Sequence, residues 1–148
     1  MTQSLYNEAI IEAGKDKTRA GRLPNPDATA TADNPLCGDR VTIDLRAENG
    51  AITDLAHTTR GCLLTKAAAA LLASHARGRP LATARALQAA ARAYLEGESN
   101  DPPFPELAVM APVKTVKSRH DCVTIAFDAL ADAAASVRAA KEGAQGEE

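Results

Sequence analysis

The feature that most constrains the fold is a run of alternating residues that ends in a turn. In residues 40–47, RVTIDLRA, valine, isoleucine and leucine alternate with polar side chains. Successive strand residues point to opposite faces, so this pattern predicts a strand with one buried face. Asn49 and Gly50 follow, and an Asn-Gly pair favours the tight turn of a β-hairpin. Residues 51–58, AITDLAHT, are therefore predicted to return as a second, antiparallel strand.

Helical patterns dominate the rest of the chain. Alanine and leucine fill residues 62–77 and 80–97, and the second of these segments opens with proline and ends with glycine, which predicts two helices. Apolar residues at helical spacing predict a long helix over 120–141 and a shorter one over 3–14. Three prolines and many polar residues predict a loop over 15–35.

The order of these elements predicts an α+β domain, in which a small antiparallel sheet of about three strands has helices packed on one face. A chain of 148 residues is long enough to bury a core without disulfide bonds. We expect a single domain over residues 1–140. The polar residues 141–148 are predicted to form a disordered tail.

Charge and hydropathy exclude several classes of partner. A net charge of -2 gives no basis for binding nucleic acid or an anionic membrane, which require concentrated positive charge. No apolar run approaches the ~18–20 residues needed to cross a bilayer. The N-terminal residues include acidic groups and lack the basic start and apolar run of a signal peptide, so we expect a cytoplasmic protein.

The three cysteines, Cys37, Cys62 and Cys122, have 24 and 59 residues between them, too many for a local metal-binding or redox pair. An odd number of cysteines cannot pair completely within one chain. Cys62 and Cys122 stand at or near predicted helix starts, where unpaired N–H groups favour a thiolate. This pattern indicates reactive or metal-bound sulfur, although cysteine is also a common buried core residue.

Asp39 stands two residues after Cys37, with a glycine between them. Three thiolates and one carboxylate would complete a tetrahedral zinc site. The same four groups would hold a small iron–sulfur cluster in which oxygen replaces one sulfur. An aspartate beside a glycine is also an ordinary turn residue, so the pattern alone leaves both interpretations open.

Three motifs, taken in order, resemble those of a known family. The segment NPLCGDRVTIDLRAENGAITDLAHTTRGC, residues 34–62, is similar to the N-terminal signature of the U-type iron–sulfur cluster assembly proteins, which comprise IscU, SufU and the N-terminal domain of NifU. The segment SRHDCVTIAFDAL, residues 118–130, resembles their C-terminal part. The resemblance covers about residues 2–140 and implies the α+β fold of that family.

Within this family the chain most resembles the SufU-like branch. Arg119 stands three residues before Cys122, and residues 94–109 lengthen the preceding stretch, as in SufU-like members. The LPPVK chaperone-recognition motif and the histidine directly before the third cysteine, which IscU-like members carry, do not occur in this sequence. The chain departs from the family at His57, where an aromatic residue is usual, and at residues 63–65, where small residues are usual.

The resemblance implies four ligands for zinc, iron or a transient iron–sulfur cluster, namely Cys37, Asp39, Cys62 and Cys122. It also implies a scaffold and sulfur acceptor rather than an enzyme. A pyridoxal-phosphate cysteine desulfurase would supply persulfide sulfur, and apo iron–sulfur proteins would take the finished cluster. Cys37 is the candidate persulfide acceptor, because we expect its loop to be the most mobile of the three cysteine-bearing segments. A SufU-like member would instead hold zinc and activate the desulfurase without building clusters.

Three further residues are candidates to adjust this site. Lys66, one helical turn after Cys62, would stabilise its thiolate. Arg119 would pair with Asp39 or with the third cysteine, and His120 would serve as an alternative ligand or proton carrier. For Lys66 and His120, as for His57, an ordinary surface or packed side chain is the favoured interpretation, whereas the family resemblance slightly favours a role for Arg119.

Two other functions fit parts of the pattern. A thiol enzyme would use Cys37 or Cys62 as its nucleophile, but no histidine base stands out by spacing and Asp39 would have no role. A structural zinc domain that binds another protein would use the same four ligands. Structural zinc sites usually rely on local ligand pairs in smaller folds, so this function is the less favoured one.

Overall fold

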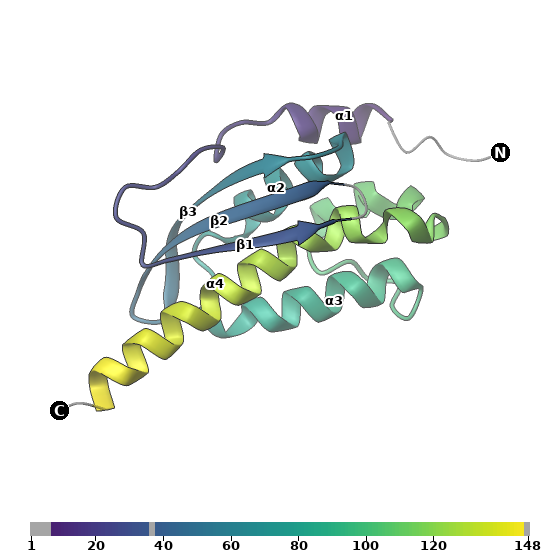
Figure 1. The fold of residues 1–148 in the computed structure, drawn as a ribbon. Helices are drawn as coiled ribbons and strands as arrows, with labels where there is room; N and C mark the ends of the chain where they lie inside the picture. Colours follow the sequence, from purple (N-terminus) through teal and green to yellow (C-terminus); the bar gives the residue numbers. More distant parts are fainter. Residues whose placement is uncertain (1–6, 36–37, 147–148) are drawn as a thin grey trace.

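The computed structural model describes residues 7–35 and 38–146, which adopt an α+β fold (Figure 1). Three strands form one antiparallel sheet in the order β1-β2-β3, namely β1 (Ala28–Asn34), β2 (Asp39–Glu48) and β3 (Ala51–Arg60). Helices pack against one face of this sheet. The predicted fold class, a small antiparallel sheet with helices on one face, is confirmed.

The hairpin predicted from residues 40–58 is also confirmed. β2 and β3 are joined at Asn49 and Gly50, whose φ angles of 54° and 79° are left-handed, as an Asn-Gly pair allows at little cost. In the register of the pair, Ile43 lies opposite His57. Directly opposed residues share a face of the sheet, so the His57 side chain lies on the same face as the buried Ile43.

The predicted loop over residues 15–35 is wrong at its C-terminal end, where β1 pairs with β2. The strand has the sequence ATATADN, and its alanines pack against the hydrophobic core while the threonines point away. The hydroxyls of Thr31 and Thr42 lie 2.9 Å apart across the two strands. Alanine differs little in hydrophobicity from threonine, so the alternation of this strand is weak in the sequence.

The N-terminal part of that loop covers the outer face of the sheet. Arg22 donates to Asp44, with its Nε 2.6 Å from Oδ2, and the backbone N–H of Leu23 donates to the same oxygen over 3.1 Å. Asp44 lies on the polar side of the alternating pattern in β2, yet it is only 1% exposed. The alternation therefore identifies the face on which Asp44 lies but not the segment that covers it.

The described residues form four α-helices, namely α1 (Glu8–Lys15), α2 (Leu63–Ala76), α3 (Ala84–Glu96) and α4 (His120–Gly146). Three 3₁₀ helices connect them, namely η1 (Leu81–Thr83), η2 (Pro105–Thr115) and η3 (Lys117–Arg119). α4 packs across β1 and β2, and α2 packs mainly on β3. α3 packs against α4, and α1 packs against α2 (Figure 1).

The helices predicted over residues 62–77 and 80–97 are confirmed, the second of them as η1 followed by α3. α4 continues to Gly146, beyond the expected end of the folded domain at residue 140. Leucines and alanines of α2, together with apolar residues of α4, form the core against the sheet. Within the described part of the chain, no helix is both long and apolar enough to cross a membrane.

Candidate metal centre

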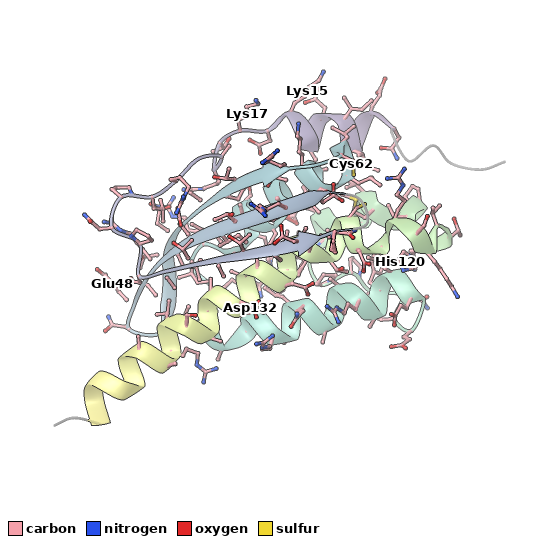
Figure 2. The ribbon with its side chains drawn as sticks, in the orientation of Figure 1. Lys15, Lys17, Glu48, Cys62, His120 and Asp132 are labelled. Carbon is pink, nitrogen blue, oxygen red and sulfur yellow. The ribbon has the colours of Figure 1, made fainter. Side chains whose placement is uncertain are left out.

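The hairpin places the first residue of β2 beside the last residue of β3, at one end of the sheet. β2 begins at Asp39 and β3 ends at Arg60, so the antiparallel pairing places Asp39 beside Cys62. Cys62 is the N-cap residue of α2, and its backbone N–H donates to Oδ1 of Asp39 over 3.2 Å. Figure 2 shows Cys62 at this end of the sheet, far from the hairpin turn that Glu48 marks.

The long helix α4 brings Cys122 to the same point. Cys122 is the third residue of α4 and is fully buried. The sulfur atoms of Cys62 and Cys122 and a carboxylate oxygen of Asp39 all lie within 4.8 Å of one another. Ligand sulfurs ~2.3 Å from a tetrahedral zinc ion lie ~3.8 Å apart, so this spacing is close to that of a metal site.

Gly61 makes room for the Asp39 carboxylate. Its φ angle is 151°, and a Cβ atom at this position would lie 2.9 Å from Cγ of Asp39 and 3.1 Å from its Cβ. A Cβ does not approach other atoms this closely without a shift of one of them, so a side chain at residue 61 would displace Asp39. The glycine before Cys62 is therefore required by the close approach of the carboxylate.

The hydrogen bonding of Asp39 leaves one oxygen for a cation. The residue is 2% exposed, and its Oδ1 accepts the hydrogen bond from Cys62. Its Oδ2 is buried and has no hydrogen-bond partner among the described residues. A buried carboxylate oxygen without a partner is costly, and a metal ion held with the two sulfurs would satisfy it. The donor set therefore fits a metal ion.

The protonation of Cys122 also depends on a cation. Burial, the neighbouring Cys62 and the Asp39 carboxylate raise the pKa of the Cys122 thiol to about 12. In the absence of a cation this thiol is protonated at neutral pH. A divalent ion held by Asp39, Cys62 and Cys122 would offset this repulsion and favour the Cys122 thiolate, so its binding would release a proton.

The family follows from sequence and structure together. Residues 5–142 match the family model described as the NifU-like N terminal domain. The chain belongs to this family. The resemblance to the U-type assembly proteins, predicted from the three motifs, is confirmed.

Some relatives of this NifU-like domain are named as cluster assembly scaffolds, and another is named as a zinc-dependent sulfurtransferase. The iron-sulfur cluster assembly scaffold protein IscU of Thermotoga maritima is 26% identical over 87% of this chain and 92% of its own length. The zinc-dependent sulfurtransferase SufU of Bacillus subtilis is 22% identical over 86% of this chain and 87% of its own length. Placement in the SufU-like branch stays a prediction, because both kinds of relative align along most of the chain.

A solved structure matches the fold closely. The N-terminal part of a nitrogen-fixing NifU-like protein from Brucella abortus superposes with a TM-score of 0.83 at 32% sequence identity. The superposition covers 90% of this chain and 94% of the Brucella chain. The sheet and helices described above are therefore those of the family.

Thr65 contacts the site of this NifU-like domain, although its role is not evident from the sequence. It lies on α2 one turn after Cys62, is fully buried, and has its Oγ1 3.4 Å from the Cys62 sulfur. A buried hydroxyl needs a partner, and the Cys62 sulfur is the partner that the structure gives it. The spacing of three residues after a cysteine at a helix start is the sequence signal that identifies such a contact.

Three of the four predicted ligands converge in the structure. Asp39, Cys62 and Cys122 form the group, and their role as ligands stays a prediction until a metal is measured. Cys37 lies outside the described residues, so its place as the fourth ligand and as the persulfide acceptor also stays a prediction.

His120, Lys66 and Arg119, which were expected to adjust the site, have other surroundings in the structure. Among the described residues no histidine belongs to the converging group. His120 begins α4, and its Nε2 lies 3.1 Å from the carbonyl oxygen of Lys114. Lys66 is exposed and lines a separate cavity, and Arg119 ends η3. Their predicted influence on metal or sulfur stays a prediction.

Proposed function

We propose that this NifU-like domain is a scaffold for iron–sulfur cluster assembly, which accepts sulfur and holds a nascent cluster at Cys37, Asp39, Cys62 and Cys122. The observation that carries this proposal is the unpartnered carboxylate oxygen of Asp39 beside two cysteine sulfurs. The names of the IscU and SufU relatives support the same chemistry. The partners of the scaffold are a cysteine desulfurase and apo iron–sulfur proteins.

Sulfur arrives by thiol exchange, and we assign the acceptor role to Cys37. The desulfurase, a pyridoxal-phosphate enzyme, carries the sulfur as the terminal atom of a cysteine persulfide. The acceptor thiolate attacks that terminal sulfur, a new S–S bond forms and the old one breaks, and the desulfurase cysteine leaves as a thiolate. Reduction of the transferred sulfur to sulfide then takes two electrons from an external thiol or electron-transfer protein. Iron enters as Fe²⁺.

Asp39 suits a site that must release what it assembles. Thiolates hold iron and zinc as soft ligands, whereas a carboxylate oxygen is harder and exchanges more readily. An incoming cysteine of the acceptor protein can therefore displace the Asp39 oxygen first. The buried position of Asp39 keeps that oxygen in place until the exchange begins.

A zinc-dependent sulfur relay is the second candidate. Two or three thiolates and one carboxylate suit tetrahedral zinc, and the SufU relative is named as zinc-dependent. In this role zinc would hold the ligand side chains in position, and the protein would activate the desulfurase by accepting its sulfur. No cluster would form.

A structural zinc role and a thiol enzyme are less well supported. Asp39, Cys62 and Cys122 lie on three elements that pack into the core, so the fold does not depend on a metal in the way that a zinc finger does. A thiol enzyme requires a base within hydrogen-bond reach of its nucleophile. Among the described residues, no histidine belongs to the group that Cys62 and Cys122 form with Asp39.

The test is metal analysis of the purified full-length protein, followed by anaerobic incubation with ferrous iron, cysteine and a desulfurase. We expect close to one metal ion per chain, and loss of this metal when any of the three cysteines is replaced by serine. A metal-free protein of equal stability would overturn the site. Visible absorbance then separates cluster assembly from zinc relay.

Asp39→Ala is the variant that distinguishes the two functions. A scaffold without the exchangeable oxygen should keep its fold, hold its cluster longer, and transfer it more slowly to apo-ferredoxin. A zinc relay should instead bind zinc less tightly and activate the desulfurase less, with no cluster in either protein. Asp33→Ala is the matched control, because Asp33 is an exposed carboxylate of β1 paired with Arg40 over 2.6 Å. If Asp39→Ala matches the parent in metal content, cluster lifetime and desulfurase activation, Asp39 is only a turn residue.

A further inference from the structure

Cys62 and Cys122 are a close pair of thiols at the starts of two packed helices. Cys62 is the N-cap residue of α2, Cys122 is the third residue of α4, and the two helices pack against each other. Their sulfur atoms lie within 4.8 Å of one another. A disulfide bond brings two sulfurs to ~2.05 Å, a gap that rotation of the side chains between staggered rotamers has to close. The pair is therefore placed to form a disulfide between the starts of α2 and α4.

The two cysteines differ in their access to solvent. Cys62 is half-buried, whereas Cys122 is fully buried. A small oxidant dissolved in water therefore meets Cys62 first. The Thr65 hydroxyl lies 3.4 Å from the Cys62 sulfur and can donate a hydrogen bond to it as a thiolate. Burial disfavours the charged form of Cys122, so this thiol is suited to the second step of an oxidation and not to the first.

We propose that Cys62 and Cys122 of the metal-free protein are a reversible redox pair, which a peroxide closes to a disulfide and a small thiol reopens. The Cys62 thiolate attacks one peroxide oxygen, the O–O bond breaks, and hydroxide leaves while Cys62 becomes a sulfenic acid. The Cys122 sulfur then attacks the Cys62 sulfur, the S–O bond breaks, and the hydroxyl leaves with the Cys122 proton as water. The two thiols lose two electrons, which the peroxide takes up.

Reduction returns the pair to its starting state. Two molecules of a small thiol reverse the reaction by thiol–disulfide exchange and leave as their own disulfide. The Cys62 end of the bond is the accessible one, so the first thiol attacks there and Cys122 leaves.

The disulfide would close the metal site. A sulfur in a disulfide is no longer a thiolate and does not bind zinc or iron, so Asp39 would be the one described ligand that remains. Metal and oxidant therefore compete for the same two sulfurs. This regulatory consequence rests on the proposed function, whereas formation of the bond rests on the placement of the two thiols alone.

The test uses the full-length protein, stripped of metal with a chelator and treated anaerobically with one equivalent of hydrogen peroxide. Free thiols are then blocked with N-ethylmaleimide, and the protein is digested with trypsin without reduction. Cleavage after arginine and lysine places the three cysteines in three separate peptides, residues 23–40, 61–66 and 120–138. Mass spectrometry of these peptides therefore distinguishes all three possible pairings.

We expect peptides 61–66 and 120–138 to be linked, Cys37 to be blocked by the maleimide, and dithiothreitol to remove the link. Three blocked thiols, a link to peptide 23–40, or a disulfide between two chains as the main product would each overturn the proposal. Cys37→Ser is the matched control, because it removes the cysteine that takes no part. It should give the same linked peptides in the same yield.

Variants of the pair test the division of roles. Cys122→Ser should stop at the sulfenic acid of Cys62, which dimedone traps as an adduct on peptide 61–66. In Cys62→Ser, the buried Cys122 should react with peroxide about tenfold more slowly than Cys62 does in Cys122→Ser. If the two thiols react at the same rate, burial does not assign the steps and the proposal fails.

Zinc separates this proposal from the proposed function. With zinc bound, the same peroxide treatment should leave peptides 61–66 and 120–138 unlinked, because the metal occupies both sulfurs. If the link forms equally with and without zinc, the redox pair stands and the proposed metal site fails. If no link forms in the metal-free protein, the redox pair fails and the proposed function is unaffected.

Discussion

Gly61→Ala is the change that most directly tests how the hairpin positions Asp39. A methyl group at residue 61 would meet the Asp39 carboxylate, with its carbon 2.9 Å from Cγ. It would also force an alanine to a φ angle of 151°. Asp39 must then move away from Cys62, so the hydrogen bond between the Cys62 N–H and Oδ1 is lost.

The two costs can be added from the structure. A non-glycine residue in a sparsely populated backbone region costs ~1–3 kcal/mol. Loss of the buried hydrogen bond to Asp39 costs a further ~1–3 kcal/mol. Movement of Asp39 relieves part of the clash, so we expect the free energy of unfolding to fall by ~2–4 kcal/mol. At an unfolding entropy of ~2.1 cal/mol/K per residue, a 148-residue chain loses ~3 °C per kcal/mol, which gives a drop of ~6–13 °C.

The assay combines thermal unfolding with metal analysis, and Gly78→Ala is its control. Gly78 has a φ angle of 88°, and an added Cβ there would have no atom within 4 Å, so this variant has backbone strain without a clash. It should lose ~1–2 kcal/mol and keep its metal. Gly61→Ala should lose more stability and also bind metal more weakly. If the two variants melt alike and bind the same amount of metal, Gly61 does not position Asp39.

Two further predictions concern residues around the site and the sheet. Thr65→Val removes the hydroxyl 3.4 Å from the Cys62 sulfur while keeping the shape, so zinc affinity should fall by about tenfold and Thr65→Ser should restore it. A chelator competition in which the valine and serine variants bind zinc alike would contradict this. Asp44→Asn should lower the free energy of unfolding by ~2–3 kcal/mol at pH 7, because a buried carboxylate with several donors is lost. Burial raises the pKa of Asp44, but hydrogen bonds from Arg22 and Thr29 outweigh it and hold the pKa below its ordinary value. A depressed pKa stabilises the fold above the unfolded-state pKa of ~3.9, and this stabilisation is lost as the pH falls toward the folded-state value. Urea unfolding should therefore show a smaller difference between parent and variant near pH 3 than at pH 7, and an equal difference would refute the assignment.

Local sequence patterns are sufficient for the elements that carry the site. The alternation in β2, the Asn-Gly turn and the alanine-rich helices are each encoded by neighbouring residues, and the structure contains all of them. The approach of Asp39 to Cys62 also follows from the hairpin, because the two residues flank its open end. The position of Cys122 does not follow locally. It depends on how α4 packs across the sheet, and only the family resemblance indicated it.

Features that depend on covering segments are not predictable in this way. β1 is missed because alternating alanine and threonine give little contrast, and Asp44 is classed with the outer face because alternation says nothing of the loop above it. The burial of His57 has the same origin. Its place opposite Ile43 is set by the register, but the wall at residues 19–21 comes from another part of the chain.

The same burial that positions Asp39, Cys62 and Cys122 would also limit how tightly they hold a metal. Cys122 is fully buried, and its thiol pKa of about 12 means that a proton must leave before the sulfur can bind an ion. On the proposed function, departure of the metal would return that proton to Cys122. The free protein would then not be left with an unpaired buried thiolate, and as a ligand Asp39 would give an incoming group a weaker bond to displace first. On the proposed function, one ligand that recovers a proton and another that exchanges readily would suit a site that hands its cargo on.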